Sequence, residues 1–475
     1  MRVAAVAIAL LAVHPVFAAE PHLPIHDPVY RGLERLAALG VINEALLKTK
    51  PLSRGALGSI VREIRANAET GSDPWIAADV RAIERRLASL GSVTDVVLDG
   101  RVVVGEGPPV PTGIERLGDR FNDGGNVRAG VELGGSLGPW AAWGYHPEIR
   151  YPVGATDDLD FATRAAYLSI AGAGLALTVG REAMWWGPGF RGSLLLTDYA
   201  RPFDLVRLEP SRPWRLKWIG ATSVHLFVTR LEADRAAIPK PYLAGLRLAF
   251  RPHRLLEVGL ARTAMFGGEG RPLTADLLWD VIRARGENDQ RNPGNQLAGA
   301  DVTVRIPWRR QPLEFYAEWG GEDHAKWLPS HPAVVAGVYL PKLFGSSRWE
   351  LRGEYADNAF ANVAGVWYQH AVYRSGYTYH GFVIGHPMGT DARMLSLEIE
   401  RRFTPEWALG ALYDGVQSGV FGPGETSGRS AGARLSYDAP TASGQLEYRY
   451  TRIEQPGEPS GDDGHVVTAS IRTLW

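Results

Sequence analysis

The chain has 475 residues, with 51 Lys and Arg against 52 Asp and Glu, so its formal net charge at pH 7 is −1. No excess of positive charge is available for nucleic acid, and a nucleic-acid partner is therefore not expected. The absence of Cys excludes disulfide bonds and Cys-ligated metal sites. With 45% hydrophobic residues the chain has enough apolar side chains to fold, which excludes intrinsic disorder.

The first 18 residues have the pattern of an export signal. Arg2 precedes an apolar run over residues 3–13, and Val16-Phe17-Ala18 resembles a cleavage site. This order predicts a signal peptide over residues 1–18 that is removed after Ala18. An exported chain without Cys cannot form wrong disulfides in an oxidising compartment.

Residues 19–94 are expected to form a small helical bundle in the periplasm. Asp27, Ser53 and Asp73 can each cap a helix, and apolar residues follow each of them at helical spacing. Asp27 and Asp73 are also followed by Pro, which is favoured at the first position of a helix. The segment therefore predicts three short amphipathic helices with a structural or docking role.

From about Val127 the hydrophobic pattern changes to a period of two. In residues 313–319, for example, Leu, Phe, Ala and Trp alternate with Glu, Tyr and Glu. In a soluble sandwich such an apolar face would be the core. In a membrane barrel the apolar face would meet lipid and the charged face would line the lumen. The alternation alone does not separate these two architectures.

The connections and the C-terminus favour the barrel. Short connections, such as those near residues 307–312 and 438–443, alternate with long ones, such as residues 181–213 and 266–295, as in outer-membrane barrels. The chain ends in an alternating strand that closes with Trp475, a type of ending that barrel-assembly machinery reads. We therefore expect an all-β transmembrane barrel of about 18 to 20 antiparallel strands over residues 95–475, in contact with the lipid of the bacterial outer membrane.

The longest predicted loop carries candidate polysaccharide-binding residues. It contains Trp185-Trp186-Gly187-Pro188-Gly189, followed by Arg191, Asp198 and Arg201. Sugar rings stack on Trp side chains, while Arg and Asp bind hydroxyl or carboxylate groups through charge-assisted hydrogen bonds. The alternative is that the two Trp side chains pack against the barrel wall as a plug and contact no ligand.

A second candidate region surrounds the end of the strand at Trp319. Glu318, Trp319, Asp323, His324 and Trp327 combine aromatic and polar groups, and we include them in the candidate set. Paired carboxylates catalyse glycoside hydrolysis only at set separations, and no two His stand at a metal-motif spacing. We expect no catalytic residue, no bound metal and no cofactor.

The loop over residues 266–295 also contains a predicted helix. Thr274 can cap it, and Leu277, Leu278, Val281 and Ile282 give it one apolar face. We expect this amphipathic helix to fold inward and to narrow the pore.

Three segments resemble the capsule-assembly Wzi family of outer-membrane proteins. They are residues 180–203, with Trp-Trp-Gly-Pro-Gly and Ala-Arg-Pro-Phe, residues 295–301, with Asn-Gln-Leu-Ala-Gly-Ala-Asp, and residues 316–323, with Tyr-Ala-Glu-Trp-Gly-Gly-Glu-Asp. The resemblance implies an 18-stranded barrel, a periplasmic helical bundle and a lectin-like role in binding capsular or related exopolysaccharide. It brings no catalytic residues. It also puts a weak strand at residues 214–220 in doubt, because our own count slightly exceeds that of the family.

We therefore predict a non-enzymatic outer-membrane protein that binds capsular or extracellular polysaccharide and helps to attach or assemble it. One alternative is a channel for sugars, which the charged inner face favours and the inward loops oppose. The other is an outer-membrane hydrolase built on Glu318, Glu322, Asp323 and His324.

Overall fold

The computed structural model of the chain describes residues 19–67, 73–90, 97–106, 116–119, 121, 124–151, 159–283, 294–322, 324–325, 328–329, 332–359, 364–420, 424–439, 441–455 and 461–474. The predicted signal peptide and Trp475 lie outside these residues. Among the helices of this described part, none is both long and apolar enough to cross a membrane.

Three helices precede the barrel, as predicted. The side chains of Asp27, Ser53 and Asp73 each accept a hydrogen bond from a backbone N–H two or three residues further on. These bonds satisfy amide groups that have no partner inside a helix. The apolar faces of the helices then pack together into one buried core. The helices, and the short strands near them, are α2 (Val29–Ala38), α3 (Arg54–Asn67), α4 (Pro74–Ser89), β1 (His22–Leu23), β2 (Thr49–Lys50) and β3 (Leu52–Ser53).

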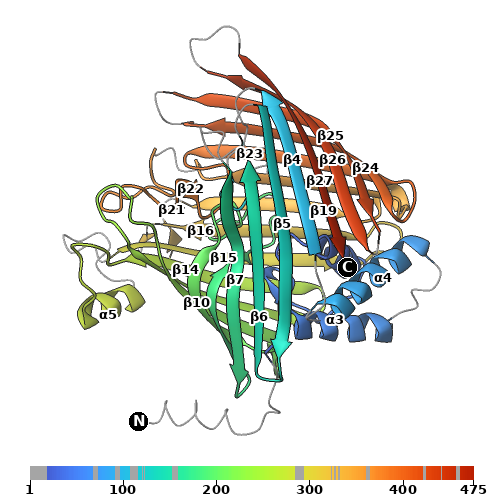
Figure 1. The fold of residues 1–475 in the computed structure, drawn as a ribbon, viewed down its shortest axis with the longest axis horizontal. Helices are drawn as coiled ribbons and strands as arrows, with labels where there is room; N and C mark the ends of the chain where they lie inside the picture. The colour runs from blue at the N-terminus through green and yellow to red at the C-terminus, as the bar shows by residue number, and fades with distance from the viewer. Residues whose placement is uncertain are drawn as a thin grey trace.

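Eighteen strands of the described chain form one closed antiparallel barrel (Figure 1). Each strand pairs with its neighbour along the chain, and the last strand pairs with the first to close the barrel. The strands are β4 (Val97–Glu106), β5 (Gly124–Leu137), β6 (Ala141–Tyr151), β7 (Asp160–Gly172), β8 (Leu175–Glu182), β10 (Phe203–Pro210), β12 (Gly220–Arg230), β13 (Tyr242–His253), β14 (Leu256–Phe266), β15 (Gly294–Ile306), β16 (Leu313–Gly321), β19 (Ala333–Leu340), β20 (Trp349–Asp357), β23 (Ala392–Arg402), β24 (Trp407–Ser418), β25 (Thr426–Asp438), β26 (Ala442–Glu454) and β27 (Asp462–Leu474).

The doubtful segment near residue 214 explains why the sequence count was slightly high. It forms only β11 (Trp214–Leu216), a three-residue hairpin arm on β12, while β10 and β12 pair directly with each other. The period of two was recognised only from about Val127, although β4 lies earlier, inside the predicted barrel range of residues 95–475. The remaining short elements lie in the loops: β9 (Trp185–Trp186), β17 (His324–Ala325), β18 (Leu328–Pro329), β21 (Thr378–Tyr379), β22 (Phe382–Val383), α5 (Ala275–Arg283) and a 3-10 turn (Leu343–Gly345).

The two faces of the wall separate by polarity in the sense expected for a membrane barrel. On β16, Glu318 is 5% exposed, whereas the next residue, Trp319, is 40% exposed. Other strands of the wall also have buried charged residues and exposed apolar residues. The side chains of Arg207, Arg247 and Arg305, for example, are fully buried. Charged groups therefore line the lumen and apolar groups cover the outside, which is the reverse of a soluble sandwich.

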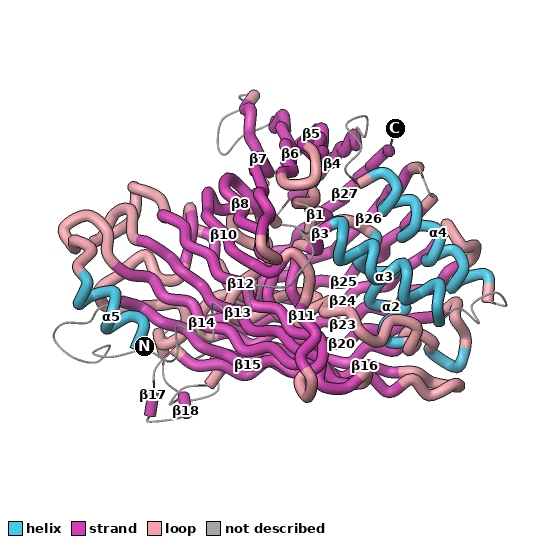
Figure 2. The backbone as a smooth tube through the Cα atoms, turned by 90° about the horizontal axis from the view of Figure 1, so that it is seen from below, coloured by secondary structure: helices cyan, strands magenta, loops and turns pink. Residues whose placement is uncertain are grey.

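The N-terminal segment, which comprises the described residues 19–67 and 73–90, covers the end of the barrel that carries the short turns. Arg35 on α2 forms an ion pair of 2.6 Å with Glu350 on β20, and Lys48 forms one of 2.8 Å with Glu314 on β16. Arg247 of the wall donates to the hydroxyl of Thr49 at 2.8 Å, so the segment enters the lumen. Figure 1 shows α3 and α4 beside the C-terminal end of β27, and Figure 2 shows the three helices together on this side.

One sequence prediction about the loops was wrong. Helix α5 does not fold into the pore, because its buried Val281 packs with Ala264 and Phe266, which point outward from β14. In Figure 1 the helix lies outside the barrel wall. Amphipathic spacing predicts an apolar face but does not say which side of the wall that face covers.

Candidate functional site

The loop with the two adjacent Trp residues fills the lumen. Trp185 and Trp186 form β9, which pairs with β2 of the N-terminal segment. They are only 5% and 2% exposed, and the indole N–H of Trp185 donates to the carbonyl of Gly187 at 3.0 Å. The ring of Trp186 packs edge-on against Phe227 of β12. Neither ring presents a free face for sugar stacking, and the arrangement corresponds to the plug alternative.

Carboxylates of the barrel wall hold the turn that follows the Trp pair. Glu318 accepts hydrogen bonds from the hydroxyl of Ser193 at 2.9 Å and from the N–H of Leu194 at 2.8 Å. Glu354 accepts from two further backbone N–H groups of the turn, those of Phe190 at 2.6 Å and Arg191 at 3.1 Å. These buried carboxylates satisfy backbone donors that would otherwise lie unpaired in the lumen.

The glycine at the start of this turn is required by the close approach to the wall. Gly187 has a φ of +134°, and a Cβ atom there would lie 2.3 Å from the carboxylate oxygen of Glu318. A side chain at this position would therefore collide with the carboxylate that holds the loop.

Arg191 points from the same turn into a buried ion pair. Its guanidinium binds both carboxylate oxygens of Asp414 on β24, at 3.0 and 3.3 Å. A bidentate pair of this kind fixes orientation as well as charge. The structure therefore gathers Trp185, Trp186, Arg191 and Glu318 into one packed cluster, with the four groups engaged with the protein.

The other candidate residues are more dispersed. Asp198 is buried and accepts from Arg116 at 3.2 Å, whereas Arg201 is exposed. Trp319 points away from the lumen, on the face expected to meet lipid. Asp323 and Trp327 lie outside the described residues, and His324 is placed only as the first residue of β17.

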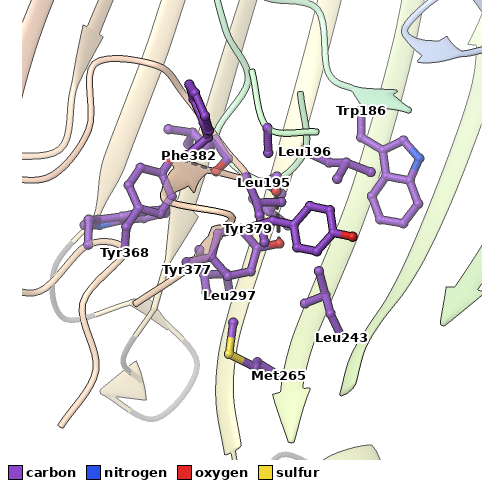
Figure 3. Close-up of a cluster of buried hydrophobic side chains, with 14 of the residues drawn as sticks. Trp186, Leu195, Leu196, Leu243, Met265, Leu297, Tyr368, Tyr377, Tyr379 and Phe382 are labelled. Carbon is purple, nitrogen blue, oxygen red and sulfur yellow. Dashed lines mark hydrogen bonds between the residues drawn. The ribbon is translucent and has the colours of Figure 1, made fainter. Parts of the chain in front are cut away.

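A second loop, which was not identified from the sequence, completes the plug that the loop over residues 183–202 forms in the lumen. Residues 358–391 connect β20 and β23, and their aromatic side chains share one buried cluster with Trp186 (Figure 3). The phenol of Tyr368 donates to the carbonyl of Leu194 at 2.7 Å, and that of Tyr377 donates to Leu195 at 3.0 Å. Burial raises the pKa of both phenols, so both remain protonated donors. The cluster members contributed by this loop are Trp367, Tyr368, Tyr373, Tyr377, Tyr379, Phe382, Ile384 and Met388.

This second loop also forms a polar cavity of about 930 Å³ at the end of the barrel that carries the long loops. The exposed side chains of Gln369 and Arg374 lie on its lining, and Asn295 contributes from the start of β15. Asn295 donates to Glu322 at 2.8 Å, while its own side-chain oxygen has no partner among the described residues. The cavity is lined by Gly294, Asn295, Gln296, Glu322, Gly365, Val366, Tyr368, Gln369, His370, Ala371, Arg374, Ser375, Gly376, Thr378, Val383 and Thr390.

Three carboxylates of the described residues lie close together and form an ion-pair network with arginine. Oxygen atoms of Glu350, Glu398 and Glu400 lie within 4.8 Å of one another. Arg31 pairs with Glu398 and Glu400, and Arg35 pairs with Glu350. Arginine therefore already supplies the positive charge that a cation would bring to this cluster.

Comparison with known proteins found a family and solved structures that are similar to this chain. Residues 111–466 match the model of the family described as capsule assembly protein Wzi. The fold is similar to that of Wzi from Escherichia coli, described as an outer-membrane protein involved in group 1 capsule assembly and as a carbohydrate-binding β-barrel. The TM-score is 0.76 at 21% identity, over 95% of this chain and 99% of that one. The Pseudomonas aeruginosa barrel OccK5 (OpdH) gives a TM-score of 0.48 at 10% identity, over 80% and 98%.

Sequence comparison also found a relative in Klebsiella pneumoniae, which is described as an uncharacterized 55.8 kDa protein in the cps region. It is 35% identical over 169 residues, which make up 34% of this chain and 33% of that protein. The match thus spans about a third of the relative's length, whereas the family model extends across most of the barrel. The chain belongs to the Wzi family of capsule assembly proteins.

Proposed function

We propose that this protein is a non-enzymatic outer-membrane protein that binds capsular or related extracellular polysaccharide and helps to hold that polymer at the cell surface. The proposal includes export by a cleaved signal peptide over residues 1–18, insertion by barrel-assembly machinery and a helical bundle in the periplasm. The single observation that carries it is the polar cavity of about 930 Å³ at the long-loop end of a barrel filled by its own loops.

The chemistry of the cavity suits a hydroxyl-rich ligand. A sugar hydroxyl both donates and accepts, and it can bond to the side-chain oxygen of Asn295 or to the amide of Gln369. Arg374 can bind a hydroxyl, or a carboxylate where the polymer is acidic. Each contact is weak, but a repeating polymer presents the same epitope many times, and this raises its overall affinity.

The polysaccharide-binding residues expected from sequence remain predictions, and their placement changes the role that we propose for them. Trp185, Trp186, Arg191 and Glu318 would act indirectly, by fixing the loop that supports Tyr368 beneath the cavity. Arg201 is exposed and would remain a candidate for direct contact.

A channel is the first alternative, and the packing of the lumen opposes it. The N-terminal segment enters from one end, the two long loops enter from the other, and β2 pairs with β9 between them. We expect purified protein in planar bilayers to show no steady large conductance. A steady large conductance would support the channel instead.

A hydrolase is the second alternative. Glu318 accepts from Ser193 and Leu194, and Glu322 accepts from Asn295 and Tyr368, so both carboxylates already hold the plug in place. We expect no turnover of a labelled polysaccharide. Turnover that is lost on changing Glu322 would contradict the non-enzymatic proposal.

The direct test is the binding of the detergent-folded protein to a panel of surface polysaccharides that includes the host's own. We expect saturable binding to one long polymer and weak binding to its short fragments. Replacing Arg374 and Gln369 together by Ala should weaken binding about tenfold or more, because about 1.4 kcal/mol corresponds to tenfold in affinity. Arg452→Ala is the matched control, since this exposed Arg is at the same end of the barrel but not on the cavity lining. Absence of binding across the panel would contradict the proposal.

A further inference from the structure

Helix α5 is attached to the outer surface of the barrel rather than to its lumen. Its Val281 and Leu277 pack against the outward side chains of Ala264 and Phe266 at the long-loop end of β14. The outward guanidinium of Arg262 donates to the backbone carbonyls of Val281 and Ile282, which lie in the last turn of the helix. The helix is therefore bound to the wall by apolar contacts along one side and by hydrogen bonds near its C-terminus.

The apolar surface of α5 is wider than the strip that the wall covers. Successive helical residues are separated by about 100°, which places Leu278 and Ile282 beside the covered strip and Trp279 on the side of the helix that faces away from the wall. Trp279 is 52% exposed and Ile282 is 64% exposed, so this part of the apolar surface is not covered by the barrel wall. Asp276 and Asp280 lie on the side of the helix opposite Leu278 and Ile282.

This uncovered face continues the surface of the barrel that meets lipid. The helix packs beside β13 and β14. Further along these two strands, Leu246 of β13 and Leu260 of β14 are exposed on the outer wall. They lie within a few residues of Ala264, where α5 begins to cover the strand. The helix thus stands at the border between the apolar band and the long loops, which is the depth of the lipid headgroups in an outer-membrane barrel.

We propose that α5 is an interfacial helix that lies in the outer leaflet, with Leu278, Trp279 and Ile282 inserted into lipid and Asp276 facing water. Amphipathic helices with Trp on the apolar side bind at this boundary, because their apolar side chains reach the acyl region while the backbone stays near the headgroups. Arg283, whose guanidinium lies 4.2 Å from the centre of the Trp279 ring, is placed to reach a lipid phosphate or carboxylate. The partner is a lipid surface rather than a second protein.

The absence of Cys allows a direct test with single labelled positions. Ile282→Cys and Asp276→Cys are each labelled with a polarity-sensitive fluorophore in the full chain and reconstituted into phosphatidylcholine vesicles with lipids that carry a shallow nitroxide quencher. Leu260→Cys reports a lipid-facing wall position, and Glu425→Cys reports an exposed loop position. Folding of every variant is checked by its heat-dependent mobility in gel electrophoresis.

We expect the label at position 282 to emit at shorter wavelength and to be quenched severalfold more than the label at 276, as at position 260. A label at 282 that resembles those at 276 and 425 would overturn the proposal and leave a protein partner as the next occupant to test. Equal strong quenching at 276 and 282 would also overturn it, because the helix would then not be oriented. Polysaccharide binding by the same variants is expected to be unchanged, so the two proposals fail independently.

Discussion

The backbone N–H of Gly187 donates to the carbonyl of Lys48 over 2.9 Å. This bond joins the two segments that fill the barrel from its opposite ends, and the pairing of β2 with β9 extends the same contact. Both partners also contact β16 of the wall. Lys48 forms an ion pair with Glu314, and Gly187 lies against Glu318. The two segments therefore meet inside the barrel through backbone pairing as well as through side chains.

Replacing Trp186 by Ala should open this contact. Loss of a buried Trp side chain lowers stability by about 3–5 kcal/mol. Here the lost packing is that between the plug and Phe227 of β12. We expect the barrel to assemble and a conductance to appear in planar bilayers. Trp218→Ala is the control, because Trp218 is fully outside the plug and exposed. An unchanged, closed Trp186→Ala barrel would show that the indole does not hold the plug.

Replacing Glu354 by Ala should loosen the turn after the Trp pair. The change leaves the N–H groups of Phe190 and Arg191 buried without an acceptor, at about 1–3 kcal/mol for each group. We expect faster amide hydrogen exchange over residues 187–195 and unchanged exchange in the barrel strands. Glu406→Ala is the matched control, because Glu406 is half-buried in a short turn and accepts from the nearby Thr404 hydroxyl. Equal exchange in the two variants would contradict the role assigned to Glu354.

Replacing Arg35 by Ala should release the helical bundle from the wall. Arg35 is buried between Asp79 of α4 and Glu350 of β20, and its removal leaves two carboxylates close together, at a cost of about 3–5 kcal/mol. Limited proteolysis should then cut residues 19–67 faster. Arg65→Ala removes only an exposed pair with Glu84, which contributes about 0–1 kcal/mol, and should behave as the unchanged protein does. Equal cleavage of Arg35→Ala and Arg65→Ala would refute this account of docking.

Docking of α2 should also weaken in acid through Glu34. Burial raises the pKa of this carboxyl, but Lys50 and Arg352 lower it more, so its pKa in the docked state lies well below the ordinary value. The contribution of Glu34 is therefore complete above about pH 4 and is lost as the pH falls through the docked pKa. Asp79 acts in the opposite sense, because burial raises its pKa to about 6. Comparing the unchanged protein with Glu34→Gln isolates the contribution of Glu34.

The measurement is hydrogen exchange in α2 at pH 3 and pH 6, corrected for the intrinsic rates. The unchanged protein should lose more protection in acid than Glu34→Gln does. The same loss in both proteins would mean that Glu34 does not couple docking to pH.

The barrel could be predicted from sequence because lipid and lumen impose opposite polarities on alternate residues. Residues 313–319 show this alternation plainly, and the wall of the structure follows it at Glu318 and Trp319. Helix caps are equally local, and those at Asp27, Ser53 and Asp73 formed as expected. The position of α5 could not be predicted in this way, because the spacing of apolar residues along a helix does not show which side of the wall they cover.

The candidate site was harder to predict, because its residues bond to partners far away along the chain. Nothing near Arg191 in sequence indicates Asp414, and nothing near Glu318 indicates that the carboxylate holds Leu194. The loop over residues 358–391 did offer a signal that was missed. It breaks the period of two for more than thirty residues and is rich in Tyr, which indicates a buried, ordered loop rather than a strand.

The most direct test of the account is hydrogen exchange of the folded protein with and without the host's own surface polysaccharide. We predict increased protection over residues 364–378 and around Asn295, and no change over residues 19–67 at the other end of the barrel. Protection confined to residues 19–67, or none in either region at a saturating concentration of polymer, would contradict it.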